Sequence, residues 1–451
     1  MKRKKNSLRK RKASSAGSED NIINYINLIN FINIKNKNKI LNRTTIMEEL
    51  TLEKFKEAAE KVKEVTAGTP LIHSDFFSSM CGNEIYLKPE NMQFTGAYKL
   101  RGAYYKISTM TDEERKKGLI TASAGNHAQG VAYAASKYGV KATVVMPTNT
   151  PLIKVNRTKG YGAEVVLYGD VYDESCNYAM KLAEEHGLTF VHPFNDLDVA
   201  TGQSSVAMEI LEELPDADYI LVPVGGGGLV TGVATLVKMI SPRTKVIAVE
   251  PEGANCLQES IKAGHVVTLP EVNTIADGTA VKTPGDKLFP YIAENIDDVI
   301  TVPDEELIVA FLDMVENHKM IVENSGLLSV AAAKHIHATG KKIVSILSGG
   351  NMDVITMSSV VQQGLVLRSR IFTVSVLLPD KPGELVKVAD IIAQAKGNVI
   401  KLAHNQFVSI NRNAAVELRI TIEAFGNEHK NEIVAALEAG GLKPRLVKVR
   451  M

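Results

Sequence analysis

Residues 219–232 read YILVPVGGGGLVTG: an apolar run, then four consecutive glycines, then the start of an apolar helix. Glycines at such a junction let backbone N–H groups converge on a phosphate at the positive end of the helix. The run does not match the G-x-G-x-x-G dinucleotide pattern, because Val230 and Thr231 stand where its last glycine should be, and it lacks the G-K-[ST] of a nucleotide loop. Taken alone, it indicates either a monophosphate site or only a tight turn between a strand and a helix.

Outward from this stretch, short apolar segments alternate with longer helical ones along most of the chain. That alternation predicts an α/β protein built on parallel sheets. The expected strands cover residues 85–87, 119–122, 142–146, 164–168, 219–224, 245–249 and 342–347, and the expected helices include 52–65, 99–110 and 128–138. Several of these strands end in polar or glycine-rich turns, which is where α/β sheets place their ligands.

Three more turns contain residues that are suited to binding or chemistry. Residues 95–103, TGAYKLRGA, place Lys99 at the start of a helix, although an isolated lysine is usually a solvated side chain. Residues 123–127, SAGNH, lie between a strand and a helix, where N–H groups and short side chains are suited to a carboxylate. Residues 348–351, SGGN, follow another expected strand. Each turn by itself is weak support for a ligand site.

Together these strings form a specific ordered set: ENMQ at residues 90–93, the Lys99 motif, SAGNH, GGGGL and SGGN. In this set the chain resembles the pyridoxal-phosphate enzymes of the tryptophan-synthase-β class, known as fold type II. It is most similar to the threonine dehydratases, also called threonine ammonia-lyases, that carry one C-terminal ACT domain. The resemblance extends from residue 48 to the end of the chain. It implies two αβα subdomains, pyridoxal 5′-phosphate as the cofactor and an amino acid as the small-molecule substrate.

The resemblance also implies roles for residues of this chain. Lys99 would be the Schiff-base lysine, Tyr98 would pack against the cofactor, and Asn126 would contact the ring hydroxyl. Ser348 would face the pyridine nitrogen. The cofactor phosphate would be bound by Gly225, Gly226, Gly227, Gly228 and Leu229, and the substrate carboxylate by Ser123, Ala124, Gly125, Asn126 and His127.

The reaction that the resemblance implies is elimination of water from L-threonine, with release of 2-oxobutanoate and ammonia; L-serine would give pyruvate. A neutral hydroxyl at Ser348 does not keep the pyridine nitrogen protonated as a carboxylate would, which favours elimination over transamination. Two alternatives stay open: a serine racemase or β-replacement enzyme of the same fold, and a catalytically dead amino-acid sensor. Ala124 argues against the racemase, since racemases of this class have a serine there. Lys99 with both glycine motifs intact argues against the sensor.

The sequence predicts no metal site. His335 and His337 are two residues apart on an expected helix, so they would face different sides. Cys256 stands where the racemases have an acidic cation ligand, which leaves Glu250 as a structural residue. Glu323 and the DGT string at residues 277–279 fall in family regions near the active site, but a turn explains DGT equally well.

Beyond residue 370 the pattern changes. Expected strands at 371–378, 398–405, 414–424 and 444–449 and expected helices at 383–395 and 429–439 follow the order β-α-β-β-α-β, which is the ferredoxin-like plan. We therefore expect a catalytic domain over 47–360, with a smaller subdomain inserted over 93–196, then a linker over 361–370 and an ACT domain over 371–451.

The DKPGEL string at residues 380–385 resembles the ligand loop of ACT domains. By this resemblance Asp380, Pro382 and Gly383 would contact an amino-acid or nucleotide effector between paired ACT domains, with Asn398 as a further contact, and would make the enzyme allosteric. A helix cap in a domain used only for oligomerisation explains the string equally well. The family also implies a homo-oligomer, a dimer or a tetramer.

Composition limits the partners further. Among 451 residues, 52 basic and 51 acidic side chains nearly cancel, so the chain has no global field that would attract nucleic acid. The cysteines Cys81, Cys176 and Cys256 are odd in number and far apart, which indicates a reducing compartment and a cytoplasmic protein. The uncharged window 219–237 contains a proline and five glycines, which argues against a membrane span.

Residues 1–46 differ from the rest of the chain. They contain 12 basic and 2 acidic residues, and residues 21–46 are rich in Asn and Ile with little apolar periodicity. We expect a disordered basic extension that is not native, with the natural start at Met47. A basic organelle-targeting segment is the alternative.

Overall fold

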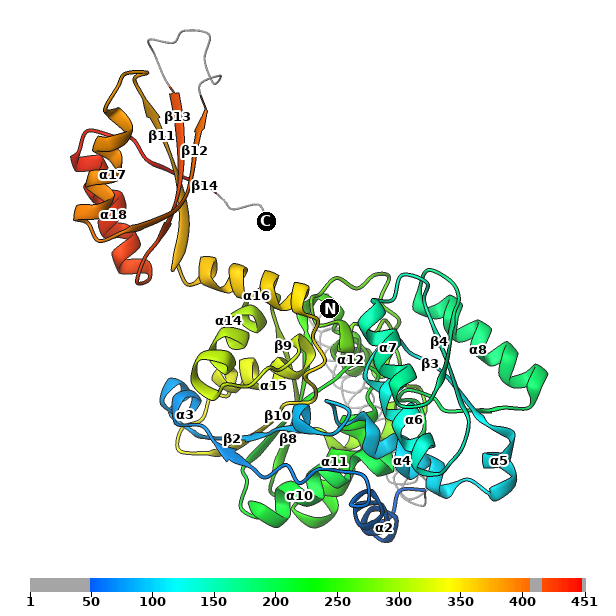
Figure 1. Cartoon of the computed structure of the whole chain (residues 1–451). Coiled ribbons are helices and arrows are strands. Elements are labelled where there is room, and N and C mark those ends of the chain that lie inside the picture. The colour runs from blue at the N-terminus through cyan, green and yellow to red at the C-terminus, as the bar shows by residue number, and fades with distance from the viewer. Residues whose placement is uncertain (1–48, 406–415, 448–451) are drawn as a thin grey trace, which may run out of the picture. The chain divides into compact units, whose positions relative to one another are not determined.

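The computed structural model describes residues 49–405 and 416–447, so the predicted extension over 1–46 and the predicted start at Met47 lie outside the described residues. Residues up to Phe55 belong to a unit of their own, of which 49–55, with the beginning of α2 (Leu52–Val62), are described. In the second unit, from Lys56 onward, the described residues form three sheets (Figure 1).

The largest sheet has six strands in the order β1-β2-β10-β7-β8-β9. These strands are β1 (Ile72–His73), β2 (Glu84–Lys88), β7 (Tyr219–Pro223), β8 (Lys245–Pro251), β9 (Asp298–Val302) and β10 (Lys342–Ile346). All neighbouring strands are parallel except β1 and β2, which are antiparallel. The helices α14 (Asp304–Asp313) and α15 (Asn324–Ala332) bury apolar side chains on one face, and α11 (Gly228–Ile240) packs on β7 and β8 from the other.

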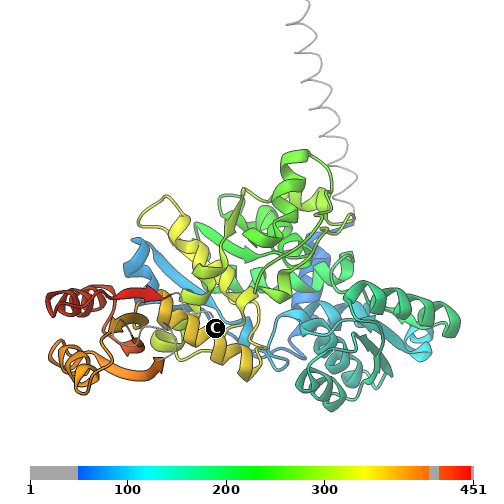
Figure 2. The ribbon, with the colours of Figure 1, turned by 90° about the horizontal axis from the view of Figure 1, so that it is seen from above.

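A second sheet, cyan to green in Figures 1 and 2, is wholly parallel and has the order β5-β4-β3-β6. Its strands are β3 (Leu119–Ala122), β4 (Ala142–Met146), β5 (Glu164–Leu167) and β6 (Thr189–Phe190). Successive residues of a strand face opposite sides. Accordingly Val144 packs in the apolar cluster that contains α6 (Asn126–Lys137), and Val145 packs in the cluster that contains α8 (Tyr172–His186).

The predicted strands and helices of these two sheets are confirmed, with small shifts at their ends. The helix predicted over 128–138 begins earlier, at Asn126, so Asn126 and His127 lie in its first turn. The other helices are α3 (Asp75–Cys81), α4 (Lys99–Thr109), α5 (Asp112–Lys117), α7 (Leu152–Gly160), α9 (Leu197–Gln203), α10 (Ser205–Glu213), α12 (Cys256–Ala263), α13 (Phe289–Asn295) and α16 (Val354–Leu367). Within residues 49–405 and 416–447, no helix has the length and apolar character needed to cross a bilayer.

The C-terminal region has its elements in the predicted order β-α-β-β-α-β. They are β11 (Ile371–Leu378), α17 (Glu384–Gln394), β12 (Asn398–Asn405), β13 (Val416–Glu423), α18 (Asn427–Ala439) and β14 (Arg445–Val447). The sheet is antiparallel with the order β12-β13-β11-β14, and both helices contribute apolar side chains to one buried cluster with it. Residues 414–415 and 448–449 of the predicted strands lie outside the described residues.

Close helix packing sets the position of α4 relative to α11. The short helix α9 contacts both of them. A Cβ on Gly202 of α9 would lie 2.7 Å from the Arg101 carbonyl oxygen of α4, and a Cβ on Gly232 of α11 would lie 2.1 Å from the Ala200 carbonyl oxygen of α9. Glycine therefore lets the three backbones approach each other, which fixes the starts of α4 and α11 in one place.

We predict that Gly232→Ala lowers the free energy of unfolding by about 1–3 kcal/mol, because the new methyl group forces α9 and α11 apart. Urea unfolding followed by circular dichroism measures this. The matched control is Gly160→Ala at the end of α7, where a Cβ meets no atom within 4 Å. Equal unfolding midpoints for the two variants would contradict the close packing.

Candidate active site

The turns with unusual composition gather at one edge of the six-stranded sheet. The strands β2, β10 and β7 are adjacent and parallel, so their carboxyl ends lie side by side. Ser348 follows β10, the glycine run at 225–228 follows β7, and the chain after β2 leads through η1 (Glu90–Met92) to Lys99. Ligand sites of open α/β sheets lie at such edges.

A pocket at this edge brings together most of the predicted site residues. Its lining consists of Tyr98, Lys99, Asn126, Phe194, Pro223, Gly225, Gly226, Gly227, Gly228, Leu229, Gly278, Thr279, Glu323, Ser325 and Ser348. The predicted residues Ser123, Ala124, Gly125 and His127 are next to Asn126 in the chain but do not line the pocket. Phe194 and Ser325 were not predicted as site residues, whereas Thr279 and Glu323 belong to the regions that the resemblance places near the active site.

Lys99 is the first residue of α4, and contacts with the end of β10 hold the chain before it. The Tyr98 N–H donates to the Ser348 carbonyl at 3.1 Å, and Ala97 pairs with Gly349 in an isolated antiparallel bridge. The Lys99 ammonium donates to the Pro193 carbonyl at 2.9 Å. Burial lowers the pKa of Lys99 to about 8, against the opposing charge of Glu323. At pH 7 about a tenth of this amine is therefore neutral and nucleophilic, against less than about a thousandth of an ordinary lysine.

The glycine run forms a backbone turn that side chains would block. A Cβ at Gly226 would lie 2.2 Å from the Phe194 ring, and one at Gly225 would lie 2.9 Å from Thr279 Cα. Gly227 has φ of 98°, in the left-handed region that favours glycine. The helix α11 starts at the next residue, so its free N–H groups and positive end face the pocket.

A hydrogen-bonded chain of polar side chains joins the helices α6 and α7 to Glu323, which precedes α15, and to Asn351, which follows β10. Asn126 Nδ2 donates to Glu323 Oε1 at 2.6 Å, and Asn351 Nδ2 donates to Asn126 Oδ1 at 2.8 Å. Asn351 Oδ1 in turn accepts from Arg157 on α7 at 3.0 Å. Burial, with the nearby charge of Asp277, raises the pKa of Glu323 to about 7. This carboxyl group therefore exchanges a proton near neutral pH.

His127 is held as a neutral ring. It is buried, its Nε2 lies 3.1 Å from the Val191 carbonyl, and burial with the charge of Lys99 lowers its pKa to about 3. The Nε2 atom therefore carries the hydrogen, and Nδ1 has no hydrogen-bond partner among the described residues. A neutral His127 contributes no positive charge. An anion at this place is therefore attracted by the positive N-terminal end of α6 and not by the histidine.

Glu250 is a structural residue, as predicted. Its buried carboxylate accepts the N–H groups of Leu257 and Gln258, both at 2.8 Å, at the start of α12. His335 ends the short helix η5 (Ala333–His335) and contacts Glu306, while His337 lies beyond that helix, so the prediction that both histidines share a helix is wrong. Within 49–405 and 416–447, no cluster of three His, Cys, Asp or Glu residues is arranged to hold a metal ion.

The structure separates the predicted effector residues. Asp380, Pro382 and Gly383 lie in the exposed loop between β11 and α17. Asn398 begins β12 and pairs with Glu423, which in turn pairs with Ile371 at the start of β11. The loop follows the other end of β11, so one chain does not bring Asn398 to it.

Comparison with known proteins decides the family. The sequence matches the family described as pyridoxal-phosphate dependent enzyme over residues 62–349. The chain belongs to this family.

The relatives of this pyridoxal-phosphate dependent enzyme include lyases and a racemase. The L-threonine ammonia-lyase of Thermotoga maritima is 40% identical over 399 residues, which cover 88% of this chain and 100% of that protein. The processed form of threonine deaminase isoform 2 from Solanum lycopersicum has a TM-score of 0.66 at 38% identity, covering 70% of this chain and 94% of that one. Maize serine racemase has a TM-score of 0.66 at 35% identity, and the match covers 70% of this chain and 98% of the racemase chain. The predicted fold type II and the predicted cofactor are thereby confirmed.

The residues of the pocket fit pyridoxal phosphate. An aldehyde requires a neutral amine, and burial brings the pKa of Lys99 to about 8. A phosphate requires converging N–H groups, and the glycine turn, where side chains would clash with Phe194 and Thr279, brings the first N–H groups of α11 to the pocket. The donors and the amine line the same pocket, which is what one small molecule with an aldehyde and a phosphate needs.

We predict that Lys99 in the cofactor-free protein is acetylated with a pH midpoint near 8, since only the neutral amine reacts. Acetic anhydride labelling across a pH series, read by peptide mass spectrometry, measures this. Surface lysines of the same sample serve as internal controls with midpoints about 10.4. A midpoint for Lys99 equal to theirs would contradict the burial of the amine.

Proposed function

We propose that this chain is a threonine ammonia-lyase, which eliminates water from L-threonine and releases 2-oxobutanoate and ammonia. L-Serine, converted to pyruvate, is the side substrate. The observation that carries the proposal is the meeting of three groups in one pocket: a lysine whose pKa is lowered by burial, the glycine turn at the N-terminus of α11, and the neutral hydroxyl of Ser348. Relatives named L-threonine ammonia-lyase that align over most of the chain support it.

In this proposal each site residue has a stated task. Pyridoxal phosphate, when bound, supplies the electron sink for the electron pair left at Cα. Lys99 carries the cofactor and, once freed, its Nζ removes the Cα proton. Residues 225–229 hold the phosphate, Tyr98 packs beside Lys99 with its ring centroid 5.4 Å from Nζ, and Asn126 orients the ring hydroxyl. Ser348 faces the ring nitrogen without protonating it, which favours elimination.

We place the binding site of the substrate carboxylate at the N-terminus of α6. The string from Ser123 to His127 joins β3 to α6, and the first N–H groups of a helix are unpaired inside the helix. A carboxylate there gains from these N–H groups and from the positive helix end. With its carboxylate held there and its amine directed to Lys99, the substrate presents Cα toward Nζ.

A serine racemase is the second candidate, favoured by the likeness to the maize racemase. Racemisation needs a second group that exchanges a proton on the opposite face of Cα. Racemases of this class place a serine immediately before the glycine of the SAGNH turn, and this chain has Ala124. A methyl group carries no exchangeable proton, so the lyase is the better proposal.

The test mixes the purified holoenzyme with L-threonine and L-serine and measures 2-oxo acid formation together with the enantiomeric purity of remaining serine. We expect faster oxo-acid formation from threonine, no D-serine, and a loss of at least about 1,000-fold in Lys99→Ala, since the lysine is both carrier and base. Racemised serine without oxo acid would establish the second candidate. A cofactor spectrum with neither product would contradict both.

We also propose that the chain divides as the sequence predicts: a catalytic domain over 47–360 with a subdomain over 93–196, a linker over 361–370, and an ACT domain over 371–451. The antiparallel sheet with two helices on one face supports the ACT assignment.

An amino-acid or nucleotide effector would bind the loop at Asp380, Pro382 and Gly383. A second copy of the domain is needed to bring Asn398 to this loop, which supports a homo-oligomer.

The three free cysteines support a location in the reducing cytoplasm.

We predict that at least one of the common amino acids or AMP changes the KM for threonine, and that Asp380→Ala removes the effect without changing activity in its absence. Asp380 is exposed and outside the active-site pocket, so the variant should fold normally. Initial rates measured with each compound test this. Identical responses in the wild type and Asp380→Ala would contradict the assignment of this loop.

A further inference from the structure

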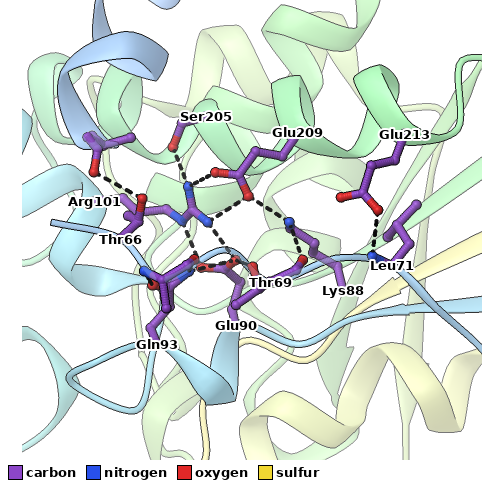
Figure 3. Close-up of polar contacts among 12 residues, drawn as sticks. Thr66, Thr69, Leu71, Lys88, Glu90, Gln93, Arg101, Ser205, Glu209 and Glu213 are labelled. Atoms are coloured by element: carbon purple, nitrogen blue, oxygen red, sulfur yellow. Dashed lines mark hydrogen bonds and ion pairs between the residues drawn. The ribbon is translucent and has the colours of Figure 1, made fainter. Parts of the chain in front are cut away.

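A largely buried cluster of charged side chains surrounds Arg101, which lies two residues after Lys99 in α4. We define the Arg101 cluster as Lys88, Glu90, Arg101, Ser205 and Glu209 (Figure 3). The side chains of Arg101 and Glu90 are fully buried, Lys88 is 1% exposed, and Glu209 is 26% exposed. Burial of three charged side chains, with a fourth partly covered, is unusual, because each buried group loses its hydration.

Every N–H of the Arg101 guanidinium has an acceptor. Nε and Nη2 donate to the two oxygens of Glu90, each at 2.8 Å. Nη1 and Nη2 donate to the two oxygens of Glu209 at 2.6 and 2.9 Å, and Nη1 also donates to Ser205 Oγ at 3.1 Å. A guanidinium presents five donors in one plane, so these contacts fix both its position and its orientation.

The charges of the cluster balance. The Lys88 ammonium donates to Glu209 and to the Thr69 carbonyl, both at 2.6 Å, so two cations face two anions. Burial alone would lower the pKa of Arg101, but Glu90 and Glu209 raise it. Burial alone would raise the pKa of Glu209, but Arg101 holds it below its usual range. The pair therefore stays charged over the working range of pH.

The cluster joins the segments that surround Lys99. Lys88 ends β2, Glu90 begins η1, and Arg101 lies in the first turn of α4. Along one face of α10, Ser205 and Glu209 are one helical turn apart, and they contact Arg101 from the side opposite Glu90 (Figure 3). The start of α4 is thus clamped between β2 and α10.

Geometry links this clamp to the amine. Residues two positions apart on an α-helix differ by about 200° around its axis. Lys99 and Arg101 therefore project to opposite sides of the first turn of α4. Any rotation of this turn that moves the guanidinium from its carboxylates moves the Lys99 side chain by the same angle. The Tyr98 N–H bond to Ser348 and the Arg101 cluster thus hold the turn from its two sides.

We propose that Arg101 is a positioning residue for Lys99: by bridging Glu90 and Glu209 it fixes the first turn of α4 so that Lys99 Nζ points into the cofactor pocket. The proposal rests on the proposed role of Lys99. A cluster that served stability alone would gain from apolar side chains of similar volume, since buried ion pairs contribute little net stability. What the planar guanidinium of Arg101 supplies, with its five donors, is a single orientation of the first turn of α4.

The test compares Arg101→Lys, Glu209→Gln and a matched control in the full-length holoenzyme. Lysine keeps the charge but has no planar fork that reaches two carboxylates. Glutamine keeps the shape of Glu209 and removes one negative charge. The control is Asp313→Asn, because Asp313 is also buried and ion-paired, with Arg368, while α14 contributes no residue to the pocket.

We expect Arg101→Lys to lower kcat for threonine by about 10- to 100-fold with KM changed by less than about threefold, the signature of a misplaced catalytic group. The visible circular dichroism of the bound cofactor should change. In the cofactor-free protein, the pH midpoint for acetylation of Lys99 should move up toward that of surface lysines. Glu209→Gln should show the same changes to a smaller degree, and Asp313→Asn should lower only the unfolding temperature.

A stable Arg101→Lys with the wild-type kcat, dichroism and labelling midpoint would overturn the proposal. If Arg101→Lys does not fold, Glu209→Gln decides by the same three measurements. Dichroism and labelling need no turnover of threonine, so they still decide the role of Arg101 if the wild type consumes no threonine. Cofactor bound to a different lysine would overturn both the positioning role and the proposed function.

Discussion

The parallel pairing of β10 with both β2 and β7 is the constraint on which the active site depends. Ser345 of β10 pairs with Leu87 on one side and Leu221 on the other, so the three strands end in register. Side chains far apart in the sequence therefore meet at one edge, and the first turns of α4 and α11 open there. Any shift of this pairing would separate the lysine from the phosphate turn.

The site combines a lysine of lowered pKa with strongly charged neighbours. Lys99 lies in the pocket where burial lowers its pKa to about 8, while the Arg101 cluster two residues away is fully charged and internally balanced. A balanced cluster has a weak field at a distance, so it holds the helix without adding a large charge next to the amine. Arg101 thus acts on the position of the amine, and the burial of Lys99 at that position lowers its pKa.

Much of this architecture could be predicted from the sequence, because its determinants are local. Apolar periodicity placed most of the strands but missed β1, β6 and β9, and turn composition marked Lys99, the glycine run and Ser348. Phe194 and Glu209 could not be singled out, since their roles depend on partners such as Gly226 and Arg101 that are distant in the chain. Asn398 was placed with Asp380 by resemblance alone, and only strand direction shows that they lie at opposite ends of β11.

The central claim is that the lysine at the start of α4 carries the cofactor. Reduction of the purified holoenzyme with borohydride, followed by digestion and tandem mass spectrometry, identifies the lysine that carries the phosphopyridoxyl group. We predict stoichiometric modification of Lys99. Modification of any other lysine, or of none in a protein that contains bound pyridoxal phosphate, would contradict it.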